Sequence, residues 1–207
     1  DRITSVHHAI SLVMGYTTAL NVAMGIASAG SLQVPKQGPL GRIRIWCDAL
    51  ECAMLCRELC KPIAKKQLID PGLAYLGGLL HNFGYMIFSH LRPKEFAILN
   101  ELVSCYPKHD IRTLEMQRFG ITHDTIGLYL LRAWNLPEEI SVIAAEHHFP
   151  DYAGEHAIYV KLVATVNRLL QQDGMLDTCH HIETVTLLED LGISESEAET
   201  VLQRVQA

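Results

Sequence analysis

Residues 74–88, AYLGGLLHNFGYMIF, contain the feature on which both the fold and the function depend. An apolar segment with helical character ends in His81, and Asn82 follows it directly. An Asp in that second position would complete a His-Asp pair, which is a common way to hold a catalytic divalent metal. The stretch therefore raises the question of whether this is a metal site or the remainder of one.

The sequence around this stretch is patterned for helices along nearly its whole length. Asp70 and Pro71 are typical of a helix start, and Gly77 with Gly78 would let another helix approach closely. Apolar residues recur near the 3.6-residue period, and VTLL at 185–188 is the only strand-like stretch. We predict an all-α domain of about ten helices. They are expected over 4–28, 42–60, 71–81, 93–104, 110–120, 122–134 and 154–172, with further helices to His90 after a break or bend at Gly84, after Pro137, and after a Ser194–Glu197 capping box. A loop is expected at 31–41.

Composition and charge exclude several classes of protein. Of the 207 residues, 49% are hydrophobic and 19% are charged, so the chain can build a sizeable core. The formal net charge is −6 and there is no run of Lys or Arg, which argues against nucleic acid as a partner. No apolar run reaches the roughly 18–20 residues that cross a bilayer, so we expect no membrane association. The chain begins DRITSVHH, without Met or a signal peptide, which fits a piece of a longer protein.

Six cysteines are present, and four of them fall on the helix expected at 42–60. Cys52, Cys56 and Cys60 are spaced i, i+4, i+8 and line one helical row. We interpret them as small buried residues of a protein in the reducing cytoplasm, because nothing pairs with this row at the spacing of a zinc site.

Eleven histidines are present, and most lie near expected helix ends or on polar faces. His81, His123, His147 and His148 differ because each has a distinctive local sequence. Taken with their neighbours, they resemble the HDOD family, a degenerate branch of the HD metal-phosphohydrolase superfamily. The matching segments are SVHHAISLVMG (5–15), RIWCDALECAMLC (44–56), YLGGLLHNFGYMIF (75–88), RFGITHDTIGLYLLRAWNLPEEI (118–140) and AEHHF (145–149).

The resemblance implies a multi-helix HD-like bundle and a division of the chain. Residues 1–172 would form the HDOD-type helical domain, without the N-terminal helical part that the family carries. Residues 173–207 would be a C-terminal helical extension packed on it. The family occurs in bacterial signal-transduction proteins, so the resemblance also implies a cytoplasmic regulatory module.

The resemblance further implies where a metal would bind in a catalytic relative. A His, a His-Asp pair and a distant Asp hold the metal there, and the corresponding positions here are Asp48, His81, Asn82 and Asn167. Only His81 keeps the family's residue type. Asn amide oxygens are neutral and weak ligands, and a hydrolytic metal needs anionic or imidazole ligands while it acidifies its water. We therefore expect a degenerate site without a metal cofactor, open only to weak adventitious divalent metal.

Two function classes follow from this ligand set. The first is a non-catalytic regulatory domain that binds a signalling protein or a small molecule. The second is a metal-dependent phosphohydrolase acting on a nucleotide or phosphodiester, and the substituted ligands disfavour it. His123, His147 and His148 are expected near the old cavity, as a buried polar cluster satisfied by hydrogen bonds. A further set of metal ligands is the alternative interpretation of these three.

Overall fold

The computed structural model describes residues 32–64, 67–107, 109–171 and 183–206. These residues form helices and connecting loops without a strand. The helices expected over 4–28 lie outside the described residues. The bounds are α3 Arg42–Ile63, α4 Pro71–Leu80, α5 Phe83–Leu91, α6 Pro93–Cys105, α7 Ile111–Phe119, α8 His123–Ala133, α9 Glu138–Glu146, α10 Ala157–Gln171, α11 Thr184–Leu191 and α12 Glu195–Gln206. The all-α prediction is thus confirmed.

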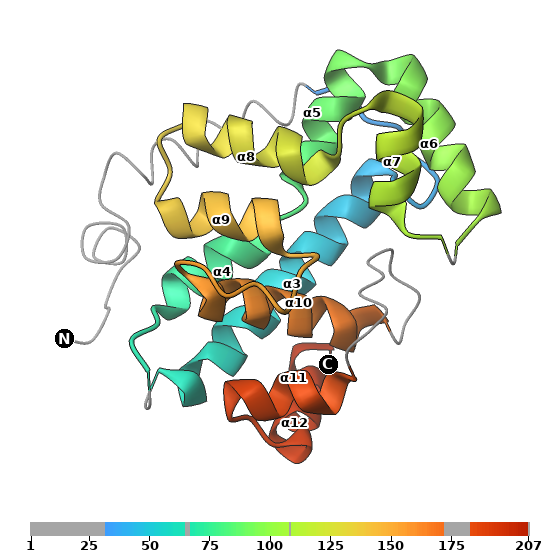
Figure 1. The fold of residues 1–207 in the computed structure, drawn as a ribbon. Coiled ribbons are helices and arrows are strands. Elements are labelled where there is room, and N and C mark those ends of the chain that lie inside the picture. Colours follow the sequence, from blue (N-terminus) through green and yellow to red (C-terminus); the bar gives the residue numbers. More distant parts are fainter. Residues whose placement is uncertain (1–31, 65–66, 108, 172–182, 207) are drawn as a thin grey trace.

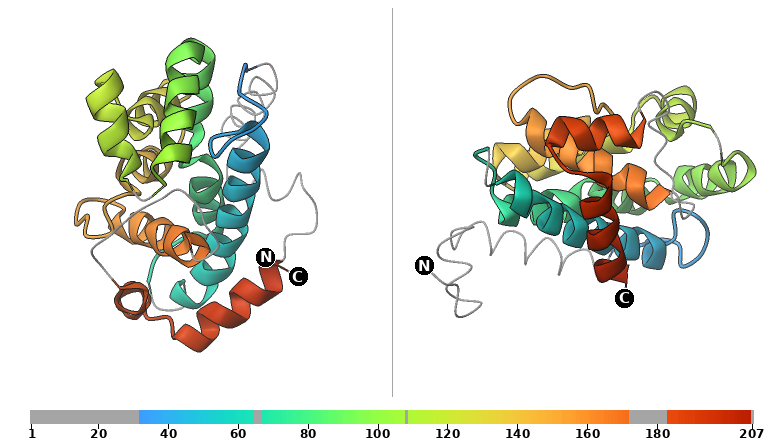
Figure 2. Two further views of the ribbon diagram at one scale, coloured as in Figure 1. Left: turned by 90° about the vertical axis from the view of Figure 1, so that its right-hand side faces the viewer. Right: turned by 90° about the horizontal axis from the view of Figure 1, so that it is seen from below.

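The long helix α3 is the centre of the bundle (Figure 1). It packs against α4, α10 and α12, and α4 in turn packs against α9 and α10. Helices α5, α6 and α7 gather at one end, where α5 contacts α8, while α11 and α12 lie at the other end (Figure 2). Of the helices that follow His81 in the chain, α9 and α10 pack against α4.

Side-chain caps fix several helix starts as predicted. The Asp70 carboxylate accepts a hydrogen bond from the Leu73 backbone N–H at 2.8 Å, at the start of α4. The Asp110 carboxylate accepts one from the Thr113 N–H at 2.8 Å, at the start of α7. Such caps satisfy backbone donors that have no partner within the helix. The expected capping box before α12 is also present and is formed by Ser194 and Glu197.

The close helix approach expected at Gly77 and Gly78 is confirmed. A Cβ on Gly78 would lie 2.8 Å from the Cα of Ala53 in α3, and a Cβ on Gly77 would meet the side chain of Ile143 in α9. Helix α4 is thereby held between α3 and α9. This contact fixes the end of α4 that carries His81.

Two local predictions are wrong. The break after α4 falls at His81 and Asn82, and Gly84 lies inside α5, where its missing side chain makes room for the carbonyl oxygen of His123. The strand-like stretch 185–188 lies within α11. There Leu187, Leu188 and Leu191 are all buried on one helical face, so tertiary packing overrides the local β pattern.

The cysteine row of α3 is buried, as predicted. Cys52, Cys56 and Cys60 are inaccessible to solvent. Burial, with a smaller contribution from Asp70, raises the pKa of the Cys60 thiol to about 12. This thiol therefore stays protonated and packs as a small apolar group.

The C-terminal helices are joined to the bundle by ion pairs as well as by packing. Arg204 of α12 lies 2.8 Å from Glu58 of α3, and Lys161 of α10 lies 2.7 Å from Asp190 of α11. The division at residue 172 stays a prediction, because residues 172–182 lie outside the described ranges. Within those ranges, no helix has both the length and the apolar character that a membrane span requires.

Candidate functional site

The four mapped metal positions come from α3, the α4–α5 junction and α10. Asp48 lies on α3 and lines a surface hollow of about 480 Å³ with Lys36, Arg44 and Glu51 among its neighbours. The Arg44 Nε donates to the Asp48 carboxylate at 2.9 Å. Burial raises the pKa of Asp48 to about 6, against the opposing charge and hydrogen bond of Arg44. The acid is thus already engaged by a neighbouring cation.

His81 and Asn82 occupy the turn between α4 and α5. His81 is 2% exposed, and its Nδ1 lies 2.7 Å from the carbonyl oxygen of Gly78, to which an Nδ1–H donates. Its ring packs edge-on against that of His147, with centroids 4.9 Å apart. The Asn82 amide makes no cap bond to α5, and its Oδ1 is buried without a hydrogen-bond partner in the described part of the chain.

Asn167 projects from α10 onto α3. Its Oδ1 accepts a hydrogen bond from the Cys52 thiol at 3.3 Å. Cys52 lies one helical turn after Asp48 on the same row of α3. Sequence reasoning missed this role of Cys52, which had no signal beyond its place in the cysteine row.

The donor set at these positions does not fit a hydrolytic divalent metal. It offers one imidazole, one carboxylate paired with Arg44, and two neutral amides, one of which accepts from a thiol. Such a set supplies too little charge to hold a metal and lower the pKa of its bound water. No catalytic step through a metal at these four positions follows from this arrangement. That they share one cavity remains a prediction.

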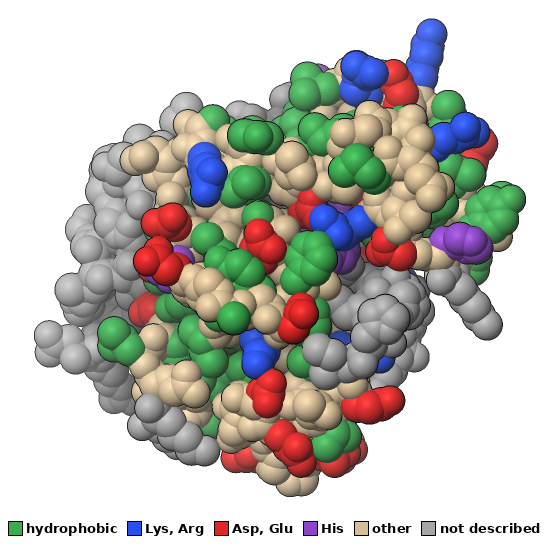
Figure 3. Space-filling model, in the orientation of Figure 1, with side chains coloured by type: hydrophobic (Ala, Val, Ile, Leu, Met, Phe, Trp, Pro, Cys, Tyr) green, Lys and Arg blue, Asp and Glu red, His purple; other side chains and the backbone are tan. Residues whose placement is uncertain are grey.

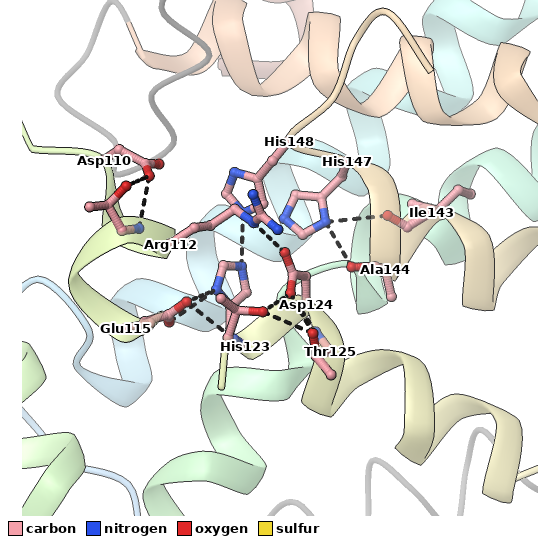
Figure 4. A network of polar contacts seen from close by, with 12 residues as sticks. Asp110, Arg112, Glu115, His123, Asp124, Thr125, Ile143, Ala144, His147 and His148 are labelled. Atoms are coloured by element: carbon pink, nitrogen blue, oxygen red, sulfur yellow. Dashed lines mark hydrogen bonds and ion pairs between the residues drawn. The ribbon is translucent and has the colours of Figure 1, made fainter. Parts of the chain in front are cut away.

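The three other singled-out histidines do come together (Figure 4). His123 opens α8, His147 is the C-cap of α9, and His148 follows it. His123 and His147 are fully buried, and His148 is half-buried. One ring nitrogen from each lies within 4.8 Å of those of the other two. The Nε2 atoms of His123 and His148 are 3.0 Å apart.

A buried carboxylate orients the first of these rings. Glu115 of α7 is inaccessible to solvent, and its two oxygens lie 3.0 Å and 2.9 Å from the Nδ1 of His123. It also accepts from the His123 backbone N–H at 3.2 Å. Tyr85 stacks on one face of the His123 ring, with ring centroids 3.9 Å apart. The carboxylate therefore orients the ring of His123 in its plane, and Tyr85 packs against its face.

An ion pair between Arg112 and Asp124 lies beside the cluster. Arg112 of α7 binds the carboxylate of Asp124, which is 2% exposed and also accepts from the Thr122 hydroxyl. Burial opposes ionisation of Asp124, but the electrostatic influence of His123 and the hydrogen bonds from Thr122 and Arg112 outweigh it and lower the pKa of the carboxyl. The guanidinium lies 4.4 Å from the centre of the Phe149 ring.

Sequence reasoning missed the acids and the arginine of this cluster. Glu115 and Arg112 lie on a helix whose sequence, IRTLEMQRF, reads as largely polar. The spacing of Glu115 from His123, eight residues across the turn at Gly120, was the available signal. Asp124 was visible as an acid directly after a singled-out histidine.

Comparison with known proteins places the chain in a family. A model of the HDOD domain matches residues 1–150. An uncharacterized protein of Treponema pallidum (strain Nichols) is 29% identical over 147 residues, which cover 70% of this chain and 28% of that protein.

Two crystal structures share the architecture. A provisionally named signal transduction protein from Marinobacter aquaeolei VT8 has a TM-score of 0.80 and 29% identity, and the match covers 99% of this chain and 45% of that one. An HDOD domain protein with unknown function from Geobacter sulfurreducens has a TM-score of 0.67 and 22% identity, covering 99% and 66%. The chain thus spans less than half of the Treponema and Marinobacter proteins.

Proposed function

Because the chain belongs to the HDOD domain family, we propose that it is a signalling domain that works by binding a protein partner and without catalysis. The similarity to the Marinobacter protein named for signal transduction supports the signalling role. A small-molecule ligand is the alternative occupant of the same scaffold.

One observation carries the non-catalytic part of the proposal. At the four mapped metal positions the only carboxylate, Asp48, is paired with Arg44, and the two amides supply no charge. Without an anionic pair at Asn82 and Asn167, a divalent ion has no field that would hold it there and activate water. Asn82 stands where catalytic relatives have the Asp of the His-Asp pair, and its neutral amide cannot bridge two metals as a carboxylate does.

The decisive assay measures hydrolysis by metal-stripped protein after addition of Mn²⁺, Fe²⁺ or Ni²⁺. A generic phosphodiester, a cyclic dinucleotide and a nucleoside monophosphate serve as substrates, and we expect no metal-dependent turnover of any of them. The triple variant Asp48→His, Asn82→Asp, Asn167→Asp is the attempted restoration. Turnover by the unmodified chain that disappears in His81→Ala would establish the phosphohydrolase alternative and overturn the proposal.

The binding part needs its own test. A pull-down with the full-length protein identifies candidates, and each is then purified and titrated against this chain alone. Saturable binding of a signalling protein supports the proposal. Mass spectrometry of the purified domain checks for a retained small molecule. If a small molecule is found and no protein partner binds, the alternative of a small-molecule ligand is favoured.

A further inference from the structure

A surface groove lies where α5, α6, α7 and α8 meet, and it contains none of the residues of the candidate site. Its volume is about 320 Å³. The apolar side chains that line it are Phe88, Leu91, Phe119, Ile121 and Ile126. Phe88 is buried and meets Phe119 edge-on, with ring centroids 5.3 Å apart, so the two rings pack together at the base of the groove.

Apolar surface at the groove is accessible to solvent. Leu91 at the end of α5 is 66% exposed, and Phe119, Ile121 and Ile126 are partly exposed. A Cβ on Gly120 would meet no atom within 4 Å beyond its chain neighbours, so the backbone next to Phe119 also faces open space. Contiguous exposed apolar surface of this kind marks interaction sites.

The rim of the groove is positively charged, although the formal net charge of the chain is −6. Arg92 and Glu95 line the groove and form an ion pair, in which the Arg92 Nε lies 2.9 Å from the carboxylate. Lys94 and Arg118 stand next in sequence to the lining residues Glu95 and Phe119, are exposed, and make no ion pair with any residue that the structure describes. Since Glu95 is already paired, the uncompensated charge at the rim is positive.

A partner for this groove must therefore combine apolar and acidic side chains. In the space-filling view, hydrophobic side chains lie beside Lys or Arg over the end formed by α5 and α6, while acidic side chains gather over the opposite end, at α11 and α12 (Figure 3). The described residues offer no sheet edge to which a strand could add, and the lining is mainly aliphatic, unlike the aromatic grooves that bind polyproline helices. An amphipathic helix laid into the groove is the recognition mode that remains.

From these observations we infer that the groove binds an amphipathic helix of a partner protein, with large apolar residues on one face and acidic residues beside that face. The apolar residues, spaced i, i+3 or i+4 and i+7, enter between Leu91, Phe119 and Ile126. The acidic residues flank them and pair with Arg92 and Arg118. The inference rests on the proposed function, because it names the surface through which the signalling domain binds its protein partner.

An anionic membrane offers similar chemistry, but the shape of the surface disfavours it. An interfacial helix buries a whole projecting apolar face by about 5–10 Å in the headgroup region. Here Phe88 is 2% exposed, and Phe119, Ile121 and Ile126 form the walls of a hollow, so Leu91 is the one apolar lining residue that projects. Side chains of a helix can enter such a hollow, whereas a lipid surface lies across it.

The first experiment selects peptides of about 15 residues, roughly four helical turns, from a displayed library with this chain as the target. Enriched sequences should carry apolar residues at helical spacing and a net negative charge. A synthetic copy of the enriched peptide is titrated by fluorescence anisotropy against a control peptide with Lys in place of every Asp and Glu. We expect saturable binding that is at least about tenfold weaker for the control and that weakens with salt. No enrichment, or enrichment of basic or non-periodic sequences, overturns the inference.

Three variants that each lower the net charge by one locate the binding surface. Leu91→Glu places an acid on the wall of the groove and should weaken peptide binding at least about tenfold. Arg118→Gln removes a rim charge and should lower the association rate and the salt dependence. Leu68→Glu changes a fully exposed leucine outside the groove and should bind like the unmodified chain. Equal binding by Leu91→Glu and Leu68→Glu overturns the inference, and circular dichroism confirms that each variant is folded.

Further measurements separate other occupants and the proposed function. Vesicles of phosphatidylcholine and phosphatidylglycerol in equal parts test for a lipid surface, and sedimentation at rising protein concentration tests for a second copy of the chain. Vesicle binding or self-association that Leu91→Glu abolishes, with no peptide selected, overturns the inference. A protein partner whose binding is unchanged in Leu91→Glu and Arg118→Gln also overturns it and leaves the proposed function standing. Peptide binding at the groove without any protein partner supports the groove and counts against the proposed function.

Discussion

The Sγ of Cys52 lies 3.3 Å from the Oδ1 of Asn167, so a thiol of α3 meets an amide of α10 in the interior of the bundle. This is the point at which α3, α4 and α10 come together, because Gly78 of α4 packs directly against the backbone of Cys52 and Ala53. The mapped metal position at Asn167 is therefore part of a packed helix junction.

The junction predicts a strong effect of Gly78→Ala. The added Cβ would lie 2.8–3.0 Å from backbone atoms of Ala53 and Cys52, which cannot rotate away. We expect the free energy of unfolding to fall by about 1–3 kcal/mol, as for other overpacked cores. Urea unfolding measures it. Gly127→Ala is the matched control, because its Cβ would meet the nearest atom at 3.6 Å and should be neutral or mildly stabilising.

Asp48 predicts a pH-dependent effect. Its pKa is raised from 3.8 to about 6, so the folded protein holds this proton more tightly than the unfolded chain does. Below about pH 4 the carboxyl is protonated in both states and does not change the free energy of unfolding. As the pH rises from there through 6, its ionisation lowers the free energy of unfolding by an increasing amount. Asp48→Asn should raise the free energy of unfolding at pH 7.5 by about 1–2 kcal/mol, within the roughly 3 kcal/mol that two pKa units represent. Urea unfolding from pH 4 to 8 measures it, and an equal effect at both ends would contradict the prediction.

The cap of α7 predicts a modest loss in Asp110→Ala. Its carboxylate accepts from both the backbone N–H and the hydroxyl of Thr113, at 2.8 Å and 2.6 Å. Removing the cap should lower the free energy of unfolding by about 1 kcal/mol, with Asp110→Asn costing a few tenths. Thermal unfolding of the three proteins checks the order. Equal losses in the two variants would assign the effect to charge and not to the cap.

The ion pair of Arg112 and Asp124 predicts a coupled pair of mutations. Arg112→Met leaves a carboxylate that is 2% exposed without its cation, which should cost about 2–4 kcal/mol. Asp124→Asn in the same chain should recover part of that loss. A double-mutant cycle from urea unfolding measures the coupling. Arg92→Met is the control, because its pair with Glu95 is exposed and should contribute little to the free energy of unfolding.

The sequence predicts the helices well where local chemistry decides them. Asp70, Asp110 and the Ser194–Glu197 pair act at short range, and each caps the helix expected to follow it. The position of the turn after α4 was missed because Gly84 serves a contact with α8, which is distant in the sequence. Residues 185–188 were misjudged for the same reason, since burial of α11 decides their conformation.

The candidate site was predictable only in part. The local sequences of His123, His147 and His148 set them apart, but their common point depends on how α8 and α9 pack. The spacing of Glu115 from His123 was the one signal for this acid, and it does not reveal that Glu115 is buried, because an acid on a polar helix usually faces solvent. The partners of Asp48 and Asn167 depend on which helix faces pack together. The resemblance assigns positions to these residues but does not say which faces meet.

The contact between Gly84 and the carbonyl oxygen of His123 limits which residue a related chain can have at the equivalent of position 84. A relative with Ala or any larger residue at the equivalent of position 84 cannot keep this separation of α5 and α8, because the added carbon would overlap that oxygen. Its counterpart of His123 would then stand farther from the ring that corresponds to Tyr85, which stacks on His123 here. The residue at this one position therefore indicates whether a relative can keep the close contact between α5 and α8.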